Sequence, residues 1–177
     1  MEPFTFMLTG GHPNSLGRTV EVVDTVLSEP ERLTELMDCY KSDDEVVRLR
    51  TSSALKRVFK AKPEWFDDWA DHLLDEVSNL DQPSAQWSQA QIFLAHGARM
   101  NDQQMTKAKN ILVRNLHQSD DWIVLNMTMK TLEQWTKADQ ALAERVIGRI
   151  EELTNDRRRS VAKCAQKTLK QMGRSPL

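Results

Sequence analysis

The sequence predicts an all-α protein, a solenoid of about four antiparallel helix pairs preceded by one capping helix. Three observations support this prediction. Apolar residues recur at spacings of three and four, one residue pattern repeats along the chain, and no segment shows the alternation typical of a strand. Because a single helix pair cannot bury its own apolar face, stacking of the pairs is expected to supply the core.

The repeat is clearest between two segments that begin at Ser42 and Ser119, 77 residues apart. In each segment, turn acids are followed by an apolar pair, a core leucine and a closing apolar residue. Further copies begin at Asp81 and Asp156. Four landmark leucines recur at intervals of 39, 38 and 37 residues, namely Leu55, Leu94, Leu132 and Leu169.

The predicted elements follow in chain order. Residues 1–14 are expected to form an N-terminal tail, either free or docked through Phe4, Phe6 and Leu8. A capping helix is expected over about 15–27, with its apolar residues on one face: Leu16, Val20, Val23 and Leu27. One repeat domain, 15–177, is then predicted to hold helix pairs at about 29–61, 62–98, 101–137 and 138–173.

Residues suited to helix starts stand between these segments. Acids in the turns can accept hydrogen bonds from the free N–H groups of a first helical turn, as an N-cap does. The first helices of the later pairs are expected to begin at Pro63, at Asn101 or Asp102, and at Asp139.

One stretch carries a family resemblance. Asp44-Glu45-Val46-Val47-Arg48, followed by Ala54-Leu55, resembles the turn and second helix of a HEAT repeat. From about residue 15 the chain is similar to the small bacterial HEAT-repeat proteins of unassigned function. The resemblance implies a right-handed, armadillo-like α-solenoid, and it implies little about function.

Composition narrows the classes of protein. The longest apolar run, 92–95, is far shorter than the roughly 20 residues that a membrane span needs. The first residues lack a cationic stretch before an apolar one, so no secretory signal is expected. Two cysteines, Cys39 and Cys164, do not indicate a disulfide framework, and we expect a cytoplasmic protein with both thiols unpaired.

No catalytic, cofactor-binding or metal-binding motif is found in the sequence. The four histidines lack the spacing of metal ligands. Asp67, Asp71 and Asp75 recur every four residues, which suits either a cation site or the solvated face of an amphipathic helix. We therefore expect no catalytic residue, metal or cofactor, and a protein that is not an enzyme.

The bases are distributed unevenly. The net charge is −2, but seven bases and no acid follow Asp156. If Val47 and Leu55 define the buried side of the second helix, its opposite side carries bases in the later repeats. We expect these to bind a partner, together with a tryptophan at an exposed turn. The candidate residues are Lys130, Lys137, Lys163, Lys167, Lys170, Arg174 and Trp122.

Two simpler interpretations stay open at this point. Cations near the C-terminal ends of helices also stabilise the helix dipole, by roughly 0.3–1 kcal/mol each. Trp122 is either a binding anchor or a side chain that packs over the adjoining loop. Leu49, Ile92 and Met129 are expected to be exposed apolar positions and are the next candidates for a binding surface.

Three functions are compared. The leading hypothesis is a non-enzymatic protein–protein interaction scaffold that uses the concave face of its second helices. Its partner would be a protein with an acidic or amphipathic segment. The alternative is a nucleic-acid-binding protein similar to HEAT-like DNA glycosylases, against which the sequence pI of 6.1 argues. A role in cofactor attachment, as in some HEAT-like lyases, has no residue-level support.

Overall fold

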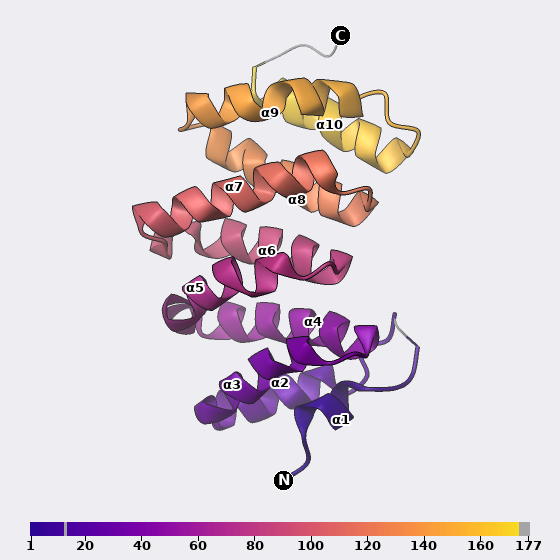
Figure 1. Cartoon of the computed structure of the whole chain (residues 1–177), viewed down its shortest axis with the longest axis vertical. Helices are drawn as coiled ribbons and strands as arrows, with labels where there is room; N and C mark the ends of the chain where they lie inside the picture. The colour runs from indigo at the N-terminus through magenta and orange to yellow at the C-terminus, as the bar shows by residue number, and fades with distance from the viewer. Residues whose placement is uncertain (13, 174–177) are drawn as a thin grey trace. The chain divides into compact units, whose positions relative to one another are not determined.

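The computed structural model describes residues 1–12 and 14–173. Within these residues the chain is all-helical, with ten α-helices, five short 3₁₀ segments and no strand (Figure 1). Contacts divide it into two compact units, unit 1 (Met1–Ser88) and unit 2 (Gln89–Leu177), and the division falls inside one helix, α6. The single repeat domain predicted over 15–177 stays a prediction.

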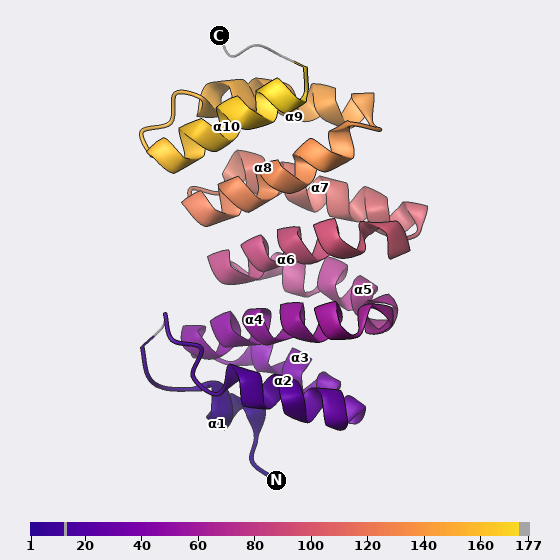
Figure 2. The same ribbon diagram turned by 180° about the vertical axis from the view of Figure 1, so that it is seen from behind.

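Unit 1 is built around its longest helix, α4 (Glu45–Ala61). This helix packs against three others, α1 (Phe4–Leu8), α2 (Thr19–Ser28) and α3 (Leu33–Asp38), and Figure 2 shows α2 and α4 side by side. The unit continues through α5 (Phe66–Asp75) into α6 (Pro83–His96). Short 3₁₀ segments adjoin several helices: Pro30–Arg32, Cys39–Lys41, Pro63–Trp65, Val77–Asn79 and, in unit 2, Gly97–Arg99.

The N-terminal residues dock into the core of unit 1, an outcome that the sequence left open, although Phe6 stays 65% exposed. Phe4 and Leu8 of α1 are fully buried. The backbone N–H of Phe4 donates a 2.7 Å hydrogen bond to Glu35 Oε1, and the guanidinium of Arg32 lies 3.9 Å from the centre of the Phe4 ring. The aromatic anchor explains the docking, because a buried phenylalanine removes a large apolar surface from water.

A buried cation holds the connection between α1 and α2. Arg50, in α4, is only 2% exposed. Its guanidinium donates hydrogen bonds to the carbonyl oxygens of five residues of that connection: Leu8, Thr9, Gly10, His12 and Ser15. Burial of a charge is costly unless its donors are satisfied, and here the backbone satisfies them.

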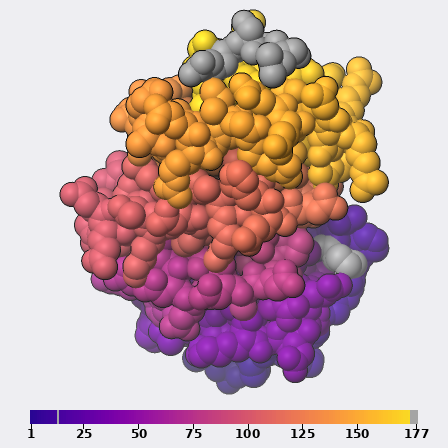
Figure 3. Space-filling view, turned by 45° about the horizontal axis from the view of Figure 1, so that its top comes forward, coloured from indigo at the N-terminus to yellow at the C-terminus, as the bar shows by residue number. Residues whose placement is uncertain are grey.

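Unit 2 contains two complete antiparallel helix pairs. The first pair is α7 (Asp102–Gln118) with α8 (Trp122–Thr136), and the second is α9 (Gln140–Leu153) with α10 (Arg159–Gln171). The first helices of the two pairs, α7 and α9, pack on each other, and so do the second helices, α8 and α10. In Figure 3 the atoms of the last pair, orange to yellow, lie directly against those of the preceding pair.

Polar contacts tie the first helices of these two pairs together. Lys109 Nζ lies 2.8 Å from Asp139 Oδ2. Further along α9, Arg145 donates to Asn110 Oδ1 at 2.9 Å and Arg149 donates to the carbonyl oxygen of Leu116. The two pairs of unit 2 are therefore held by hydrogen bonds along α7 and α9 as well as by their apolar faces.

Most of the helix starts agree with the caps expected from the sequence. The carboxylate of Asp44 accepts a hydrogen bond from the backbone N–H of Val46 at the start of α4. Asp121 and Asp139 cap α8 and α9 in the same way. Asn101, one of the two expected alternatives, forms a capping box with Gln104 at the start of α7. These short side chains fix where each helix begins.

The predicted core register is confirmed in three of the four repeats and wrong in one. Leu55, Leu132 and Leu169 are fully buried, whereas Leu94 is 40% exposed and its neighbour Phe93 is buried instead. In α6 the repeat is thus displaced by one residue, and one residue corresponds to a rotation of about 100° around a helix. The displacement makes Trp87, which lies 38 residues after Leu49, the counterpart of that leucine.

This displacement and the packing of α8 overturn two further expectations. Ile92 and Met129 were expected among the exposed apolar positions, but both are buried. Ile92 points to the core because α6 is rotated relative to the predicted register. Met129 is buried because α8 packs against α7, α9 and α10 and presents little free surface.

Candidate interaction surface on α8 and α10

The two units carry opposite net charge. Unit 1 contains 9 bases and 17 acids, a balance of −8, and unit 2 contains 15 bases and 9 acids, a balance of +6. The chain's overall charge of −2 therefore hides a strongly basic unit. A local field of this kind acts on partners over about 8–10 Å at physiological salt.

Three lysines of α10 lie on the side opposite its core. Val161, Ala165 and Leu169 face the interior and are fully buried. Lys163, Lys167 and Lys170 are exposed, and their spacing of four and three residues aligns them along one helical face. The helix is therefore amphipathic, with one apolar side and an opposite side that carries the three lysines.

Helix α8 and the C-cap residue that follows it contribute two further lysines. Lys130 and Lys137 are exposed, and Lys137 Nζ donates to Gln134 Oε1 at 2.8 Å. Lys137 borders a cleft of about 410 Å³ with Gln171 and Gly173 at the end of α10, which places it next to that helix. We call Lys130, Lys137, Lys163, Lys167 and Lys170 the lysine surface.

The environment of Cys164 shows that α8 and α10 present their cations on a common side. Burial raises the pKa of this half-buried thiol, and the positive charges of Lys130 and Lys167 oppose that shift. Lys130 comes from α8 and Lys167 from α10, so both ammonium groups act on one thiol. Glu133 lies close enough to add a negative charge.

Most of the lysine surface is free of carboxylate partners. In the part of the chain that the structure describes, no ion pair involves Lys130, Lys163, Lys167 or Lys170. Dipole compensation accounts for Lys170, which stands in the last turn of α10, but Lys163 and Lys167 lie earlier in the helix. Unpaired lysines at mid-helix are available to an external anion.

An arginine that sequence reasoning missed holds the N-terminal ends of α8 and α10 together. Arg158 forms an ion pair with Asp156 at 2.7 Å and with Asp120 at 3.2 Å, and it also donates to the carbonyl oxygen of Asp120. The turn before α10 is thereby joined to the turn before α8. Only the pairing of turns 38 residues apart reveals this role, and no local sequence signal does.

Trp122 stands at that same end of the surface. It is the first residue of α8, after the N-cap Asp121, and it is 49% exposed. Half of a large aromatic side chain thus remains accessible beside a turn held by Arg158. Arg174, the remaining candidate, lies outside the described residues.

The described residues hold no metal-binding cluster and no membrane-spanning helix, and the chain matches no protein compared with it. Among the described residues no group of three or more His, Cys, Asp or Glu side chains could hold a metal ion. No helix in the same residues has the length and apolar character to cross a bilayer. A comparison with family models, curated proteins and solved structures found no match.

Proposed function

We propose that this chain is a HEAT-like, non-enzymatic binding module that uses the lysine surface to hold an acidic segment of another protein. The observation that carries the proposal is the row of Lys163, Lys167 and Lys170 on α10 with Lys130 on the adjacent α8, all exposed and without carboxylate partners in the described residues. Stacked helix pairs present extended surfaces, which suits recognition of a long segment. Cationic rims mainly accelerate association and select partners of opposite charge.

The HEAT-like assignment itself rests on local features. Antiparallel helix pairs of similar length repeat in unit 2, with second helix on second helix. Aspartates cap the second helices in both units, at Asp44 and Asp121. Each feature supports a repeat architecture and leaves the partner to be found by experiment.

The test uses charge reversal. Lys163→Glu, Lys167→Glu and Lys170→Glu together should leave helicity nearly unchanged, because the three positions are exposed and glutamate is a good helix former. Binding of a fluorescent oligoglutamate peptide, measured by anisotropy, should fall at least about tenfold, and the difference should shrink at high salt.

A matched control keeps the change in net charge and moves it to unit 1. Lys41→Glu, Lys60→Glu and Lys62→Glu reverse three exposed lysines there. This variant should bind the peptide far better than the α10 variant does. Equal losses in both would show that only total charge matters, and the lysine surface would then not be a specific site.

One observation favours a second candidate, a nucleic-acid phosphate backbone. The acids that argue against phosphate binding lie mainly in unit 1, so unit 2 alone is basic. A labelled DNA duplex in the same assay separates the two, because binding of a phosphate backbone weakens steeply with salt as counterions are released. Tighter binding of the duplex than of the peptide at physiological salt would favour this second candidate.

A further inference from the structure

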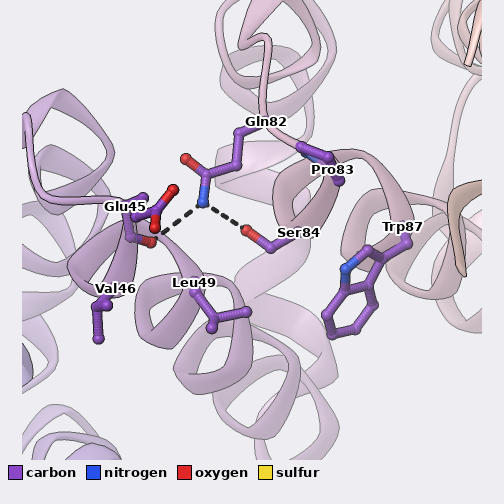
Figure 4. A pocket seen from close by; sticks show the side chains of 7 residues that line it. All are labelled: Glu45, Val46, Leu49, Gln82, Pro83, Ser84 and Trp87. Carbon is purple, nitrogen blue, oxygen red and sulfur yellow. Dashed lines mark hydrogen bonds between the residues drawn. The ribbon is translucent and has the colours of Figure 1, made fainter. Parts of the chain in front are cut away.

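A second surface of opposite character lies in unit 1. A cleft of about 250 Å³ opens between the first turns of α4 and α6 (Figure 4). Its walls are mainly apolar, with Val46 and Leu49 on one side and Pro83 and Trp87 on the other. In Figure 4 the indole of Trp87 and the side chain of Leu49 face the opening from opposite sides.

The base of the cleft is fixed by a glutamine whose side-chain amide makes hydrogen bonds through both its nitrogen and its oxygen. Gln82 Nε2 donates to the carbonyl oxygen of Glu45 at 3.1 Å and to Ser84 Oγ at 2.8 Å. Its Oε1 accepts a hydrogen bond from Arg48, which also donates to the carbonyl oxygen of Ser42. The bonds join the turn before α4 to the turn before α6, so the walls are held in place without a ligand.

Trp87 is also held in position, and part of it stays available. The ammonium of Lys56 lies 4.0 Å from the centre of the indole ring, a cation–π contact that fixes the ring. The residue is half-buried, and its indole N–H makes no hydrogen bond within the described residues. A partly exposed tryptophan in a preformed cleft is a common binding anchor.

The surroundings of the cleft are acidic. Glu45 lines it and is exposed, and Asp43 and Asp81, each within two residues of the lining, are exposed as well. None of the three takes part in an ion pair in the described part of the chain. Two cations, Arg48 and Lys56, also lie at the cleft, so the three acids outnumber the bases there, in keeping with the −8 balance of unit 1.

We propose that this cleft binds a linear segment of another protein that presents one large apolar side chain flanked by lysine or arginine. The volume is below the roughly 300–1,000 Å³ of pockets that enclose a whole small ligand, but it suits a single side chain. Apolar walls supply the anchor, and the acidic rim selects the flanking bases. This surface selects the opposite charge from the lysine surface, so the inference goes beyond the proposed function.

Selection from a phage-displayed library of random short peptides tests the proposal. On the wild-type chain, the enriched peptides should share a large apolar residue with Lys or Arg beside it. On Leu49→Arg, which places a long cation in the cleft, these peptides should no longer be enriched. Val46→Arg serves as a second blocking variant if circular dichroism shows that Leu49→Arg is not folded.

A switch of the rim charge gives the sharper readout. Glu45→Lys with Asp81→Lys should keep the apolar residue in the enriched peptides and change its flanks from basic to acidic. Asp24→Lys with Glu31→Lys makes the same change in net charge at exposed acids of unit 1 that do not line the cleft, and it should leave the flanks basic. The proposal is overturned if wild type enriches nothing, if Leu49→Arg enriches the same peptides, or if the control changes the flanks as the rim pair does.

Discussion

Arg50 Nη1 donates a 2.6 Å hydrogen bond to the carbonyl oxygen of Gly10, across 40 residues of sequence. This bond is one of several that the same guanidinium makes to the connection between α1 and α2. A cation buried among carbonyl oxygens cannot be replaced by an apolar side chain without leaving several acceptors unpaired. Arg50 thus holds the N-terminal segment in place, together with the buried Phe4.

Arg50→Met should therefore lower the free energy of unfolding by at least about 2 kcal/mol, because hydrogen bonds to charged groups are the stronger ones. It should also accelerate amide hydrogen exchange in residues 4–12. Arg57→Met is the control, since Arg57 donates to Ser53 within its own helix and, among the described residues, makes no hydrogen bond with residues 4–12. If exchange in residues 4–12 is unchanged in Arg50→Met, the guanidinium does not hold this segment.

Two glycines should respond in opposite directions to alanine. Gly17 has a φ of +52°, and a Cβ there would lie 2.8 Å from Arg50 Cζ, so Gly17→Ala should destabilise by more than about 1 kcal/mol. Gly148 lies inside α9 with open space around it, and Gly148→Ala should stabilise by roughly 0.5–1 kcal/mol. Urea denaturation measures both, and changes of the same sign would contradict the structure at one site.

Substitution of the landmark leucines should reveal the displaced register. Leu55→Ala and Leu132→Ala should each cost about 2–5 kcal/mol, because both side chains are fully buried. Leu94→Ala should cost less than about 1 kcal/mol, since this leucine is exposed. A loss at Leu94 as large as at Leu55 would restore the register that the sequence alone predicted.

The two thiols should differ in reactivity. Both cysteines are unpaired in the structure, as the sequence predicted. Burial raises the pKa of the Cys39 thiol to about 12, and the side chain is inaccessible, whereas Cys164 is half-buried. Iodoacetamide at pH 8 should modify Cys164 first, and peptide mass spectrometry would detect the order. Faster modification of Cys39 would indicate that unit 1 opens around α3.

The contact between Asp156 and Arg158 should make stability depend on acid. Hydrogen bonds from Arg158 lower the pKa of Asp156 to about 2, compared with about 4 for an unfolded aspartate. The carboxylate therefore stabilises the fold above pH 4, and this contribution is lost as the pH falls towards 2. Asp156→Asn should lower the urea midpoint at pH 7 and change it much less at pH 2. If Asp156→Asn lowers the urea midpoint equally at pH 7 and pH 2, the charge on Asp156 does not contribute to stability.

The sequence determined the local features of this protein, because their causes act within one or two helical turns. Apolar spacing identified the helical character of α4, α8 and α10 and one buried leucine in each, Leu55, Leu132 and Leu169. Turn aspartates such as Asp44 and Asp121 identified the helix starts. The exposed lysines of α10 followed from the same periodicity, since a residue opposite the core of a surface helix faces water.

Tertiary structure alone decided which side chains meet across long separations. The sequence could not distinguish Phe93 from Leu94 as the core residue of α6, because both are apolar and a displacement of one residue depends on how the helix packs. Arg50 and Arg158 looked like ordinary surface bases until distant carbonyl and carboxylate groups were brought to them. The cleft between Leu49 and Trp87 likewise exists only because two helix starts, 38 residues apart in sequence, lie side by side.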